Sequence, residues 1–292
     1  MLIRSFITLI LLGTSLLYAK ELKKGLLERI IQPKLTLKSS YLSMTEIEGG
    51  KGSLKVQKNT LRINNKIMGF TYDNLAFSWN DIAALPFGDK KSAPIKEMHS
   101  LKFNINAPYF LNKKWFILNS ISLRSSFENK MSGSYGGKIF SFASYKINDD
   151  HAIQMGAFAN YHKISTLALP VLSYSYRARQ SDGLQVILGF PRTYIGYYIN
   201  QAALLKLGII FSQSVTKLSD DSRIENAGFI EAKNYMGNLG LSYELNRHMR
   251  FESNLLYGLK RDFTIFDAQG NEQSSYAIEP SFGANIKVVW LF

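Results

Sequence analysis

The C-terminal stretch from Tyr276 to Phe292 reads YAIEPSFGANIKVVWLF and alternates between two kinds of side chain. One row holds every second residue: Tyr276, Ile278, Pro280, Phe282, Ala284, Ile286, Val288, Trp290 and Phe292. The interleaved row, which begins Ala277, Glu279, Ser281, is more polar. A period of two places the rows on opposite faces of a strand. This row exceeds the usual strand of about 5 to 6 residues, so we predict a bilayer-crossing strand, which needs about 9 to 11.

The same rhythm recurs upstream. Apolar rows of period two run through 101–107, 115–123, 153–161, 203–211, 239–245 and 249–257. Short, turn-rich links at 64–66, 106–114, 148–151, 180–183, 200–201 and 246–248 alternate with longer links at 44–52, 80–98, 128–137, 214–228 and 261–274. Short turns at one rim and long loops at the other are typical of a transmembrane β-barrel. The predicted fold is therefore all-β, a transmembrane antiparallel up-and-down β-barrel.

The number of strands follows from these links. Counting from Leu35 gives about 14 strands, which leaves room for about 10 spanning residues and a connection in each. Twelve is the alternative, because the segment 184–199 contains Pro191 and would give two short strands. A change of phase between Tyr72 and Leu75 predicts a β-bulge near Asn74.

The chain ending resembles a known signal. The residues Ile286, Val288, Trp290 and Phe292 resemble the C-terminal signal of bacterial outer-membrane β-barrel proteins. The resemblance implies the outer membrane of a Gram-negative bacterium, with the barrel assembly machinery and lipopolysaccharide as partners. Length and strand number are similar to those of small monomeric channels. The alternative is a secreted β-sandwich, in which the apolar rows would face a core between two sheets.

The N-terminus predicts export. Residues 1–19, MLIRSFITLILLGTSLLYA, have the charged, apolar and small-residue parts of a signal peptide. A membrane anchor is the alternative, although the apolar stretch is shorter than the ~20 residues that span a bilayer. Residues 20–33 form a periplasmic lead-in, either a short helix or a disordered segment, and 34–292 form the barrel domain. Export excludes intracellular nucleic acid as a partner, despite 35 basic and 22 acidic residues.

Composition excludes two other classes. Outside the N-terminus no run of apolar residues is long enough for a membrane helix. Aromatic residues make up 13% of the chain, which is too much apolar mass for an intrinsically disordered protein. The chain has no cysteine, so it contains no disulfide and no thiolate metal site.

If the apolar rows face lipid, the opposite rows line a lumen. The predicted pore-lining bases are Lys34, Lys38, Lys55, Lys102, Arg124, Lys146, Arg177, Lys206, Arg250 and Lys287. The predicted pore-lining acids are Glu244, Glu252 and Glu279. An excess of Lys and Arg in a pore favours anions. Alternatively, these bases pair with the three carboxylates or bind lipopolysaccharide phosphate near the rims.

Two further features concern the width of the lumen. Gly and Ser are frequent on the inner rows, for example Gly156, Gly208 and Gly240, and we expect them both to leave space and to relieve crowding in a curved sheet. The longest link, 80–98, contains the apolar run 82–87, IAALPF. We expect this patch either to fold into the mouth and narrow it or to remain a mobile surface loop.

The sequence offers little for catalysis. His99 and Ser100 are neighbours on a strand and point to opposite faces, and His151 and His248 lie at the short-turn rim. Only His162 with Ser165, at an outer loop, could serve a lipid-modifying enzyme. Asp220, Asp221 and Glu225 could hold Ca²⁺, but their spacing is not the EF-hand pattern. We expect no enzyme activity, no cofactor and no metal.

These observations lead to a prediction of function. We expect a passive channel for small anionic solutes. A closed barrel that acts as an envelope-structural or surface-interaction protein is the second possibility. A lipid-modifying enzyme that depends on His162 is the third.

Overall fold

A computed structural model describes residues 32–48, 52–178, 180–190 and 192–292. The predicted signal peptide and all but the last two residues of the lead-in lie outside this part of the chain. The first strands are β1 (Lys34–Glu46), β2 (Ser53–Asn64), β3 (Met68–Asn80), β4 (Glu97–Phe110), β5 (Trp115–Phe127), β6 (Tyr135–Lys146), β7 (His151–His162) and β8 (Ser165–Tyr176). The later strands are β9 (Gly183–Gly189), β10 (Arg192–Tyr198), β11 (Ala203–Lys217), β12 (Phe229–Asn246), β13 (Met249–Phe266), β14 (Glu272–Ile278) and β15 (Phe282–Leu291).

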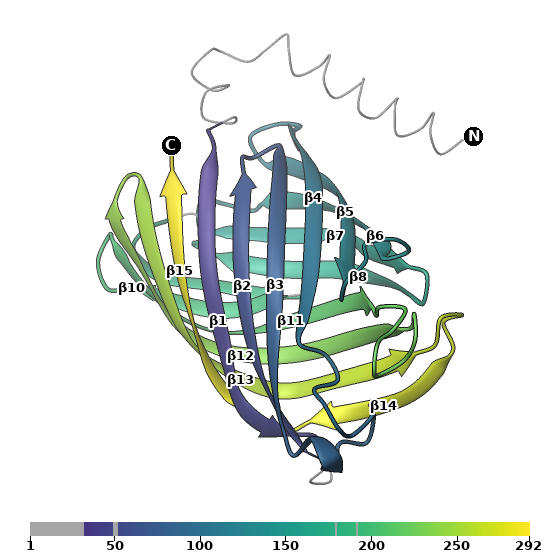
Figure 1. The fold of residues 1–292 in the computed structure, drawn as a ribbon. Coiled ribbons are helices and arrows are strands. Elements are labelled where there is room, and N and C mark those ends of the chain that lie inside the picture. The colour runs from purple at the N-terminus through teal and green to yellow at the C-terminus, as the bar shows by residue number, and fades with distance from the viewer. Residues whose placement is uncertain (1–31, 49–51, 179, 191) are drawn as a thin grey trace, which may run out of the picture.

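The strands form one closed antiparallel barrel. Each strand from β1 to β12 pairs with the next, β12 pairs with β13, and β15 joins β13 to β1 (Figure 1). Both β14 and β15 pair with β13, so they are two halves of one wall position, and the wall has 14 positions. The predicted fold class and strand number are confirmed. The segment 184–199 forms β9 and β10, so the alternative of twelve strands is wrong.

The C-terminal row is interrupted, contrary to the prediction of a single strand. Residues 279–281 separate β14 from β15, and Pro280 lies in this break, because proline cannot donate a ladder hydrogen bond. The face that points inward also changes. Tyr276 and Ile278 pack against the interior cluster, whereas Phe282 and Ile286 on β15 are among the most exposed apolar side chains.

The outer surface carries large apolar side chains that suit lipid. Leu123, Ile139, Leu207 and Leu255, each on a different strand, are more than half exposed. Aromatic pairs border this surface at both ends: Trp115–Tyr145 and Trp290–Phe292 near the short turns, and Phe211–Tyr235 and Tyr257–Phe282 toward the long loops. Such girdles mark the two interfaces of a membrane-spanning barrel. Within the described residues, no helix is long and apolar enough to cross a membrane.

The predicted bulge near Asn74 is absent. The registers of β3 with β2 and with β4 run without a shift through Asn74. The change of phase has another cause, because the inside of the barrel becomes apolar at this level. Leu75, Phe77 and Trp79 point inward and pack against the interior cluster.

That interior cluster fills the long-loop end of the barrel. The loop between β3 and β4 contributes Leu85, Phe87 and Ile95, which are 0%, 8% and 2% exposed. Phe87 contacts Phe263 and Tyr276 with ring centroids 5.3 Å apart in both pairs. The other buried members are Ile47, Leu54, Met98, Leu218, Ile230, Phe263 and Ile265. The apolar patch of the 80–98 loop therefore lies inside the mouth, which was one of its two predicted positions.

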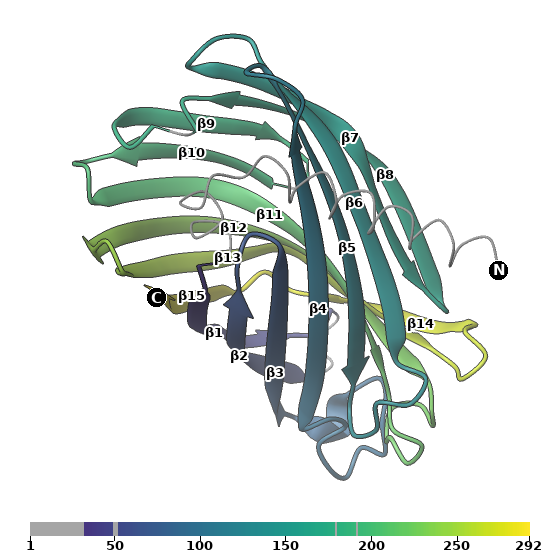
Figure 2. The same cartoon turned by 90° about the horizontal axis from the view of Figure 1, so that it is seen from above.

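A second contact crosses the barrel at the same end. Lys217 at the end of β11 forms a parallel bridge with Phe127 at the end of β5. The carboxylate of Glu128 then accepts hydrogen bonds from the backbone N–H and the hydroxyl of Ser219, at 2.9 and 3.1 Å. The end of β11 therefore bends inward toward β5 (Figure 2). The long-loop end is narrowed by strand contacts as well as by the loop.

Candidate functional site: a basic ladder inside the barrel

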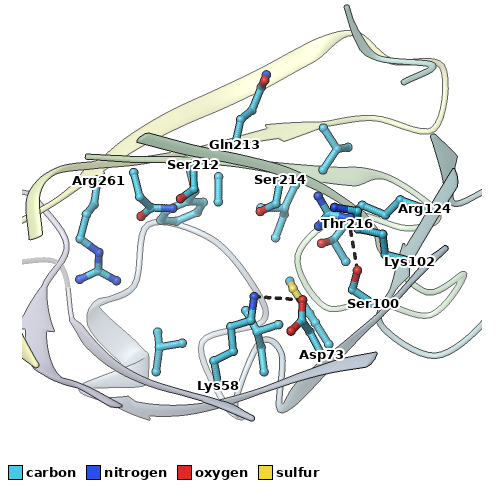
Figure 3. A pocket seen from close by; sticks show the side chains of 18 of the residues that line it. Lys58, Asp73, Ser100, Lys102, Arg124, Ser212, Gln213, Ser214, Thr216 and Arg261 are labelled. Carbon is cyan, nitrogen blue, oxygen red and sulfur yellow. Dashed lines mark hydrogen bonds and ion pairs between the residues drawn. The ribbon is translucent and has the colours of Figure 1, made fainter. Parts of the chain in front are cut away.

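A cavity of about 620 Å³ lies beside the interior cluster and is lined by charged side chains. Its basic lining residues are Lys38, Lys58, Arg62, Lys102, Arg124, Lys138 and Arg261. In Figure 3, Lys58 and Asp73 meet on one wall, and Lys102 and Arg124 lie together near Ser100. The cavity is therefore surrounded by cations from several strands.

Strand register places three of these cations in one row. Thr71 of β3 is opposite both Arg62 of β2 and Lys102 of β4, and Lys102 is opposite Arg124 of β5. Directly opposed residues have Cβ atoms about 4.5 to 5.5 Å apart. We call Arg62, Lys102 and Arg124, with Lys138 of β6, the basic ladder. Like charges at opposed positions destabilise a sheet, so stability does not explain why the ladder is basic.

The hydrogen bonds of the ladder arginines go to hydroxyl groups. Arg62 donates from Nε to the Thr71 hydroxyl at 3.2 Å, and Arg124 donates from Nε to the hydroxyls of Ser100 and Ser126 at 3.2 and 2.8 Å. No ladder residue forms an ion pair with a carboxylate among the described residues. Nearby Asp73 is paired with Lys58 at 3.1 Å. The ladder therefore presents net positive charge to the cavity.

Lys138 has a distinct environment. Its Nζ lies 4.4 Å from the centroid of the Phe158 ring, within the range of a cation–π interaction. Phe158 is opposite both Phe140 of β6 and Leu169 of β8. The cationic ladder therefore ends beside an apolar part of the inner wall.

A second charged group surrounds Glu252 of β13. Its carboxylate pairs with Lys287 at 2.9 Å and with Arg250 at 3.1 Å. Lys34 and Lys206 lie close enough to interact with Glu252, Arg250 and Lys287. One carboxylate is therefore shared among several cations.

The structure places most of the predicted pore-lining residues in two regions. Those on the inside are Lys34, Lys38, Lys102, Arg124, Lys206, Arg250, Lys287 and Glu252. Those at the short-turn rim are Lys146, Arg177 and Glu244. Lys146 pairs with Asp149, and Arg177 pairs with Asp150 and Asp182. The Glu244 carboxylate lies 3.9 Å from the Arg250 guanidinium.

Lys55 and Glu279 differ from the prediction. Lys55 stacks over Tyr41, which is 43% exposed on the outer face. The other parity of β2 faces inward, and its members Leu54, Val56 and Lys58 line the cavity. Glu279 lies in the break between β14 and β15, where its backbone N–H donates to Glu46 and its carbonyl accepts from the Thr45 hydroxyl.

Sequence reasoning missed Lys58, Arg62, Lys138 and Arg261. Lys138 has the same parity as Lys146 on β6, so a full reading of that strand would have found it. An inward Lys55 gives β2 the opposite phase and so directs Lys58 and Arg62 outward, which hides them from a prediction based on parity. Arg261 follows a register shift in β13, and its guanidinium donates to the Ser281 hydroxyl at 2.8 Å.

The inner glycines relieve crowding, which was one of their two predicted roles. A Cβ added to Gly156 would meet the carbonyl oxygen of Ser141, and one added to Gly240 would meet the side chain of Asn254. At Gly208 the nearest atom would be the Thr193 carbonyl oxygen, at 2.6 Å. These positions allow neighbouring strands to approach closely.

The candidate pair His162 and Ser165 is not joined by a hydrogen bond. The Ser165 hydroxyl donates to the Glu231 carboxylate at 2.8 Å. His162 is 5% exposed, its ring packs edge-on against Phe229, and its Nε2 has no hydrogen-bond partner among the described residues. In this structure, therefore, the Ser165 hydroxyl is directed at Glu231 and not at the imidazole of His162.

Asp220, in the loop between β11 and β12 that carries the candidate Ca²⁺ ligands, is paired with lysine side chains of the protein itself. Asp220 pairs with Lys130 at 3.1 Å, and the hydrogen bond from Lys130 lowers the pKa of Asp220 below its usual value. Lys217 also lies 3.7 Å from this carboxylate. The charge of Asp220 is therefore balanced by lysines in this structure.

Comparison with known proteins gives likenesses of structure. No protein-family model matches the chain, and no curated protein matches it in sequence. Similar solved structures include the NanC porin, with 11% identity, a TM-score of 0.40, and coverage of 88% of this chain and 98% of that one. The KdgM porin, solved in complex with disordered oligogalacturonate, has 9% identity, a TM-score of 0.35 and coverage of 88% and 99%. The toluene transporter TodX of Pseudomonas putida has 11% identity, a TM-score of 0.34 and coverage of 89% and 90%. These structure neighbours are outer-membrane channel barrels.

Proposed function

We propose that the protein is a passive conduit for small anionic solutes across the outer membrane of a Gram-negative bacterium. The basic ladder is the observation that supports this function. Arg62, Lys102, Arg124 and Lys138 face one cavity and are not ion-paired with any carboxylate among the described residues. Cations lining a narrow, partly apolar passage raise the local concentration of anions and repel cations.

The lipid-facing surface supports the proposed location. The exposed apolar rows and the two aromatic borders are the features of a barrel that crosses an outer membrane. The C-terminal residues Trp290 and Phe292 stack at the short-turn border, with ring centroids 6.1 Å apart. Recognition of this end by the assembly machinery is part of the proposal.

The solute path is narrow in this conformation. Leu85, Phe87 and Ile95 lie inside the mouth, and the ends of β5 and β11 are bridged. We propose that movement of the loop between β3 and β4 controls the width of the mouth. The packed mouth also supports the second candidate function, a closed barrel that acts in the envelope through its loops.

Single-channel recording in planar bilayers separates these functions. Under a KCl gradient, the conduit gives discrete currents and a reversal potential that shows Cl⁻ preference, and Lys102→Gln lowers this preference. Lys55→Gln is the matched control, because Lys55 lies on the outer face over Tyr41. Cation preference of the unaltered protein would overturn the anion selectivity, and absence of current would favour the closed barrel.

A further inference from the structure

The barrel wall is interrupted between β8 and β11. The hairpin of β9 and β10 is short, and β8 pairs with β9 only from Ser173 to Tyr176. On the other side, β11 pairs with β10 only as far as Ile210. Above these points, no ladder pairing joins residues 165–172 to β9 or residues 211–216 to β10 within the described chain. We call this unpaired region the β8–β11 opening.

The β8–β11 opening reaches the depth of the outer leaflet. Thr166 is opposite Tyr161, an exposed aromatic residue near the long-loop border. Deeper along β8, Leu172 is opposite Met155, and both side chains are well exposed on the outer surface. The opening therefore extends from the aromatic border into the lipid-facing part of the wall.

The β11 side of the opening borders the cavity. Residues 211–216 all line the cavity, so this part of β11 borders the space along its whole length. In Figure 3, Ser212 and Ser214 point into the space and Gln213 points the other way. Unpaired backbone at membrane depth is tolerated where it borders a water-filled cavity and is very costly in lipid. Water in the cavity can supply hydrogen bonds to these strand edges.

Polar contacts close the opening toward the long loops. Gln213 donates to the Ser165 hydroxyl at 3.3 Å, and both residues also bond to the Glu231 carboxylate. Lys233 pairs with the same carboxylate at 2.9 Å. The opening is therefore a side window, bounded above by these contacts and below by the ends of β9 and β10 at Gly189 and Arg192.

A row of apolar side chains runs along the inner wall toward this window. We call it the apolar lane, and its members are Phe116, Phe142, Phe140, Phe158 and Leu169. The ring centroids of Phe116 and Phe142 are 6.1 Å apart, and those of Phe140 and Phe142 are 5.2 Å apart. Phe140 is opposite Phe158, which is opposite Leu169 on the unpaired part of β8. The interior of a water-filled barrel is usually polar. The apolar lane therefore favours binding of a solute that has an apolar part.

We propose that the window admits amphiphilic anions, with one anionic head and an alkyl or aryl body, between the cavity and the outer leaflet. The head binds at Lys102, Arg124 and Lys138, and the body lies along Phe158 and Leu169. Lys138 lies 4.4 Å from the Phe158 ring, so the charge and the apolar lane are adjacent. This inference rests on the proposed conduit and names its solute class.

Phe158→Trp provides the reporter for a binding test, because Phe158 lines the cavity beside Lys138, where the head and the body of the solute meet. In a W79F/W115F/W290F background, reconstituted in vesicles, 12-bromododecanoate should saturably quench the fluorescence of the Phe158→Trp reporter. Two comparators should not quench at the same concentration: bromoacetate, which lacks the body, and 12-bromododecyltrimethylammonium, which has the opposite charge. Equal quenching by the cationic amphiphile would overturn the site.

Substitutions test the residues that hold the head. Lys102→Gln with Lys138→Gln should weaken bromododecanoate binding at least tenfold, since a charge-assisted contact is lost at each position. Lys55→Gln should leave binding unchanged. Unchanged binding in the double variant would overturn the assignment, and Lys138→Gln alone serves if the double variant does not refold.

Amide hydrogen exchange tests the window itself. Peptides covering 166–172 and 211–216 should exchange much faster than the fully paired peptide 239–243 of β12. Equal protection of all three would overturn the window. Binding without anion-selective current would overturn the conduit and keep the site, whereas selective current without binding would overturn only the site.

Discussion

Lys102 on β4 and Arg124 on β5 occupy directly opposed positions in the barrel wall, and both line the cavity. Hydroxyl groups, rather than carboxylates, accept the hydrogen bonds from Arg124 Nε. Two like charges held side by side in this way act on whatever enters the cavity.

Replacing Lys102 by Gln should lower anion preference without loss of stability. Removing one of two opposed like charges should raise the free energy of unfolding by about 0.2 to 1 kcal/mol. Urea unfolding in lipid vesicles measures stability, and the reversal potential measures selectivity. Marked destabilisation with unchanged selectivity would make the ladder a structural feature.

Replacing Glu252 by Gln should increase anion preference and reduce stability. Lys287 and Arg250 lose their shared carboxylate, which is 16% exposed. The arginine is 35% exposed, so solvent screens part of the cost, and we expect a loss of about 1 to 2 kcal/mol. The same two measurements apply. Gln57→Ala, on an exposed part of β2, provides a control for nonspecific destabilisation.

Deleting residues 82–92 should widen the mouth. The deletion removes Leu85 and Phe87, which fill the interior cluster. Single-channel conductance should rise severalfold, and exclusion of larger neutral solutes in liposome-swelling assays should weaken. A deletion variant with the original conductance would show that the bridge between β5 and β11 sets the limit instead.

Acid should loosen the loop between β13 and β14. The hydrogen bond from the Asn271 side chain, together with backbone N–H donors at residues 269–271, lowers the pKa of Asp267. The contribution of the ionised carboxylate is complete above the ordinary aspartate pKa and is lost as pH falls through the lowered value.

Protease cleavage measures this loosening. Lys163, between β7 and β8, donates a hydrogen bond to the Ala268 carbonyl at 2.8 Å and so helps to hold the loop in place. When the Asp267 contacts are lost, cleavage at 267–271 should increase. Asp267→Asn should reproduce at neutral pH the cleavage seen in acid. Glu272→Gln, a neighbouring exposed carboxylate, should not. Identical cleavage of all three proteins at every pH would contradict the prediction.

The fold was predictable because the lipid-facing rows repeat along the chain. Rows such as 203–211 and 249–257 meet one solvent, lipid, and therefore keep one pattern. The interior does not present one environment. Its long-loop half is an apolar cluster, so Leu75, Phe77 and Trp79 on β3 resemble a lipid-facing row although they point inward.

Local phase limited the prediction of the site. Lys102, Arg124 and Lys287 lie on strands whose apolar rows are unambiguous, and they point inward. On β2 the apolar residues Leu54 and Val56 face the interior cluster, whereas Leu61 and Ile63 face lipid. Because both parities contain apolar residues there, the pattern favoured Lys55 over Lys58.

The break at 279–281 has a consequence for the seam that closes the cylinder. Below it, β1 and β15 pair in continuous register from Lys34 to Leu42. Above it, within the described residues, only the isolated Ile47–Ile278 bridge and a few neighbouring hydrogen bonds join the end of β1 to the end of β14. Under heat or mechanical load, the first and last strands should therefore separate first in this upper section, and the separation should then proceed toward the short-turn rim.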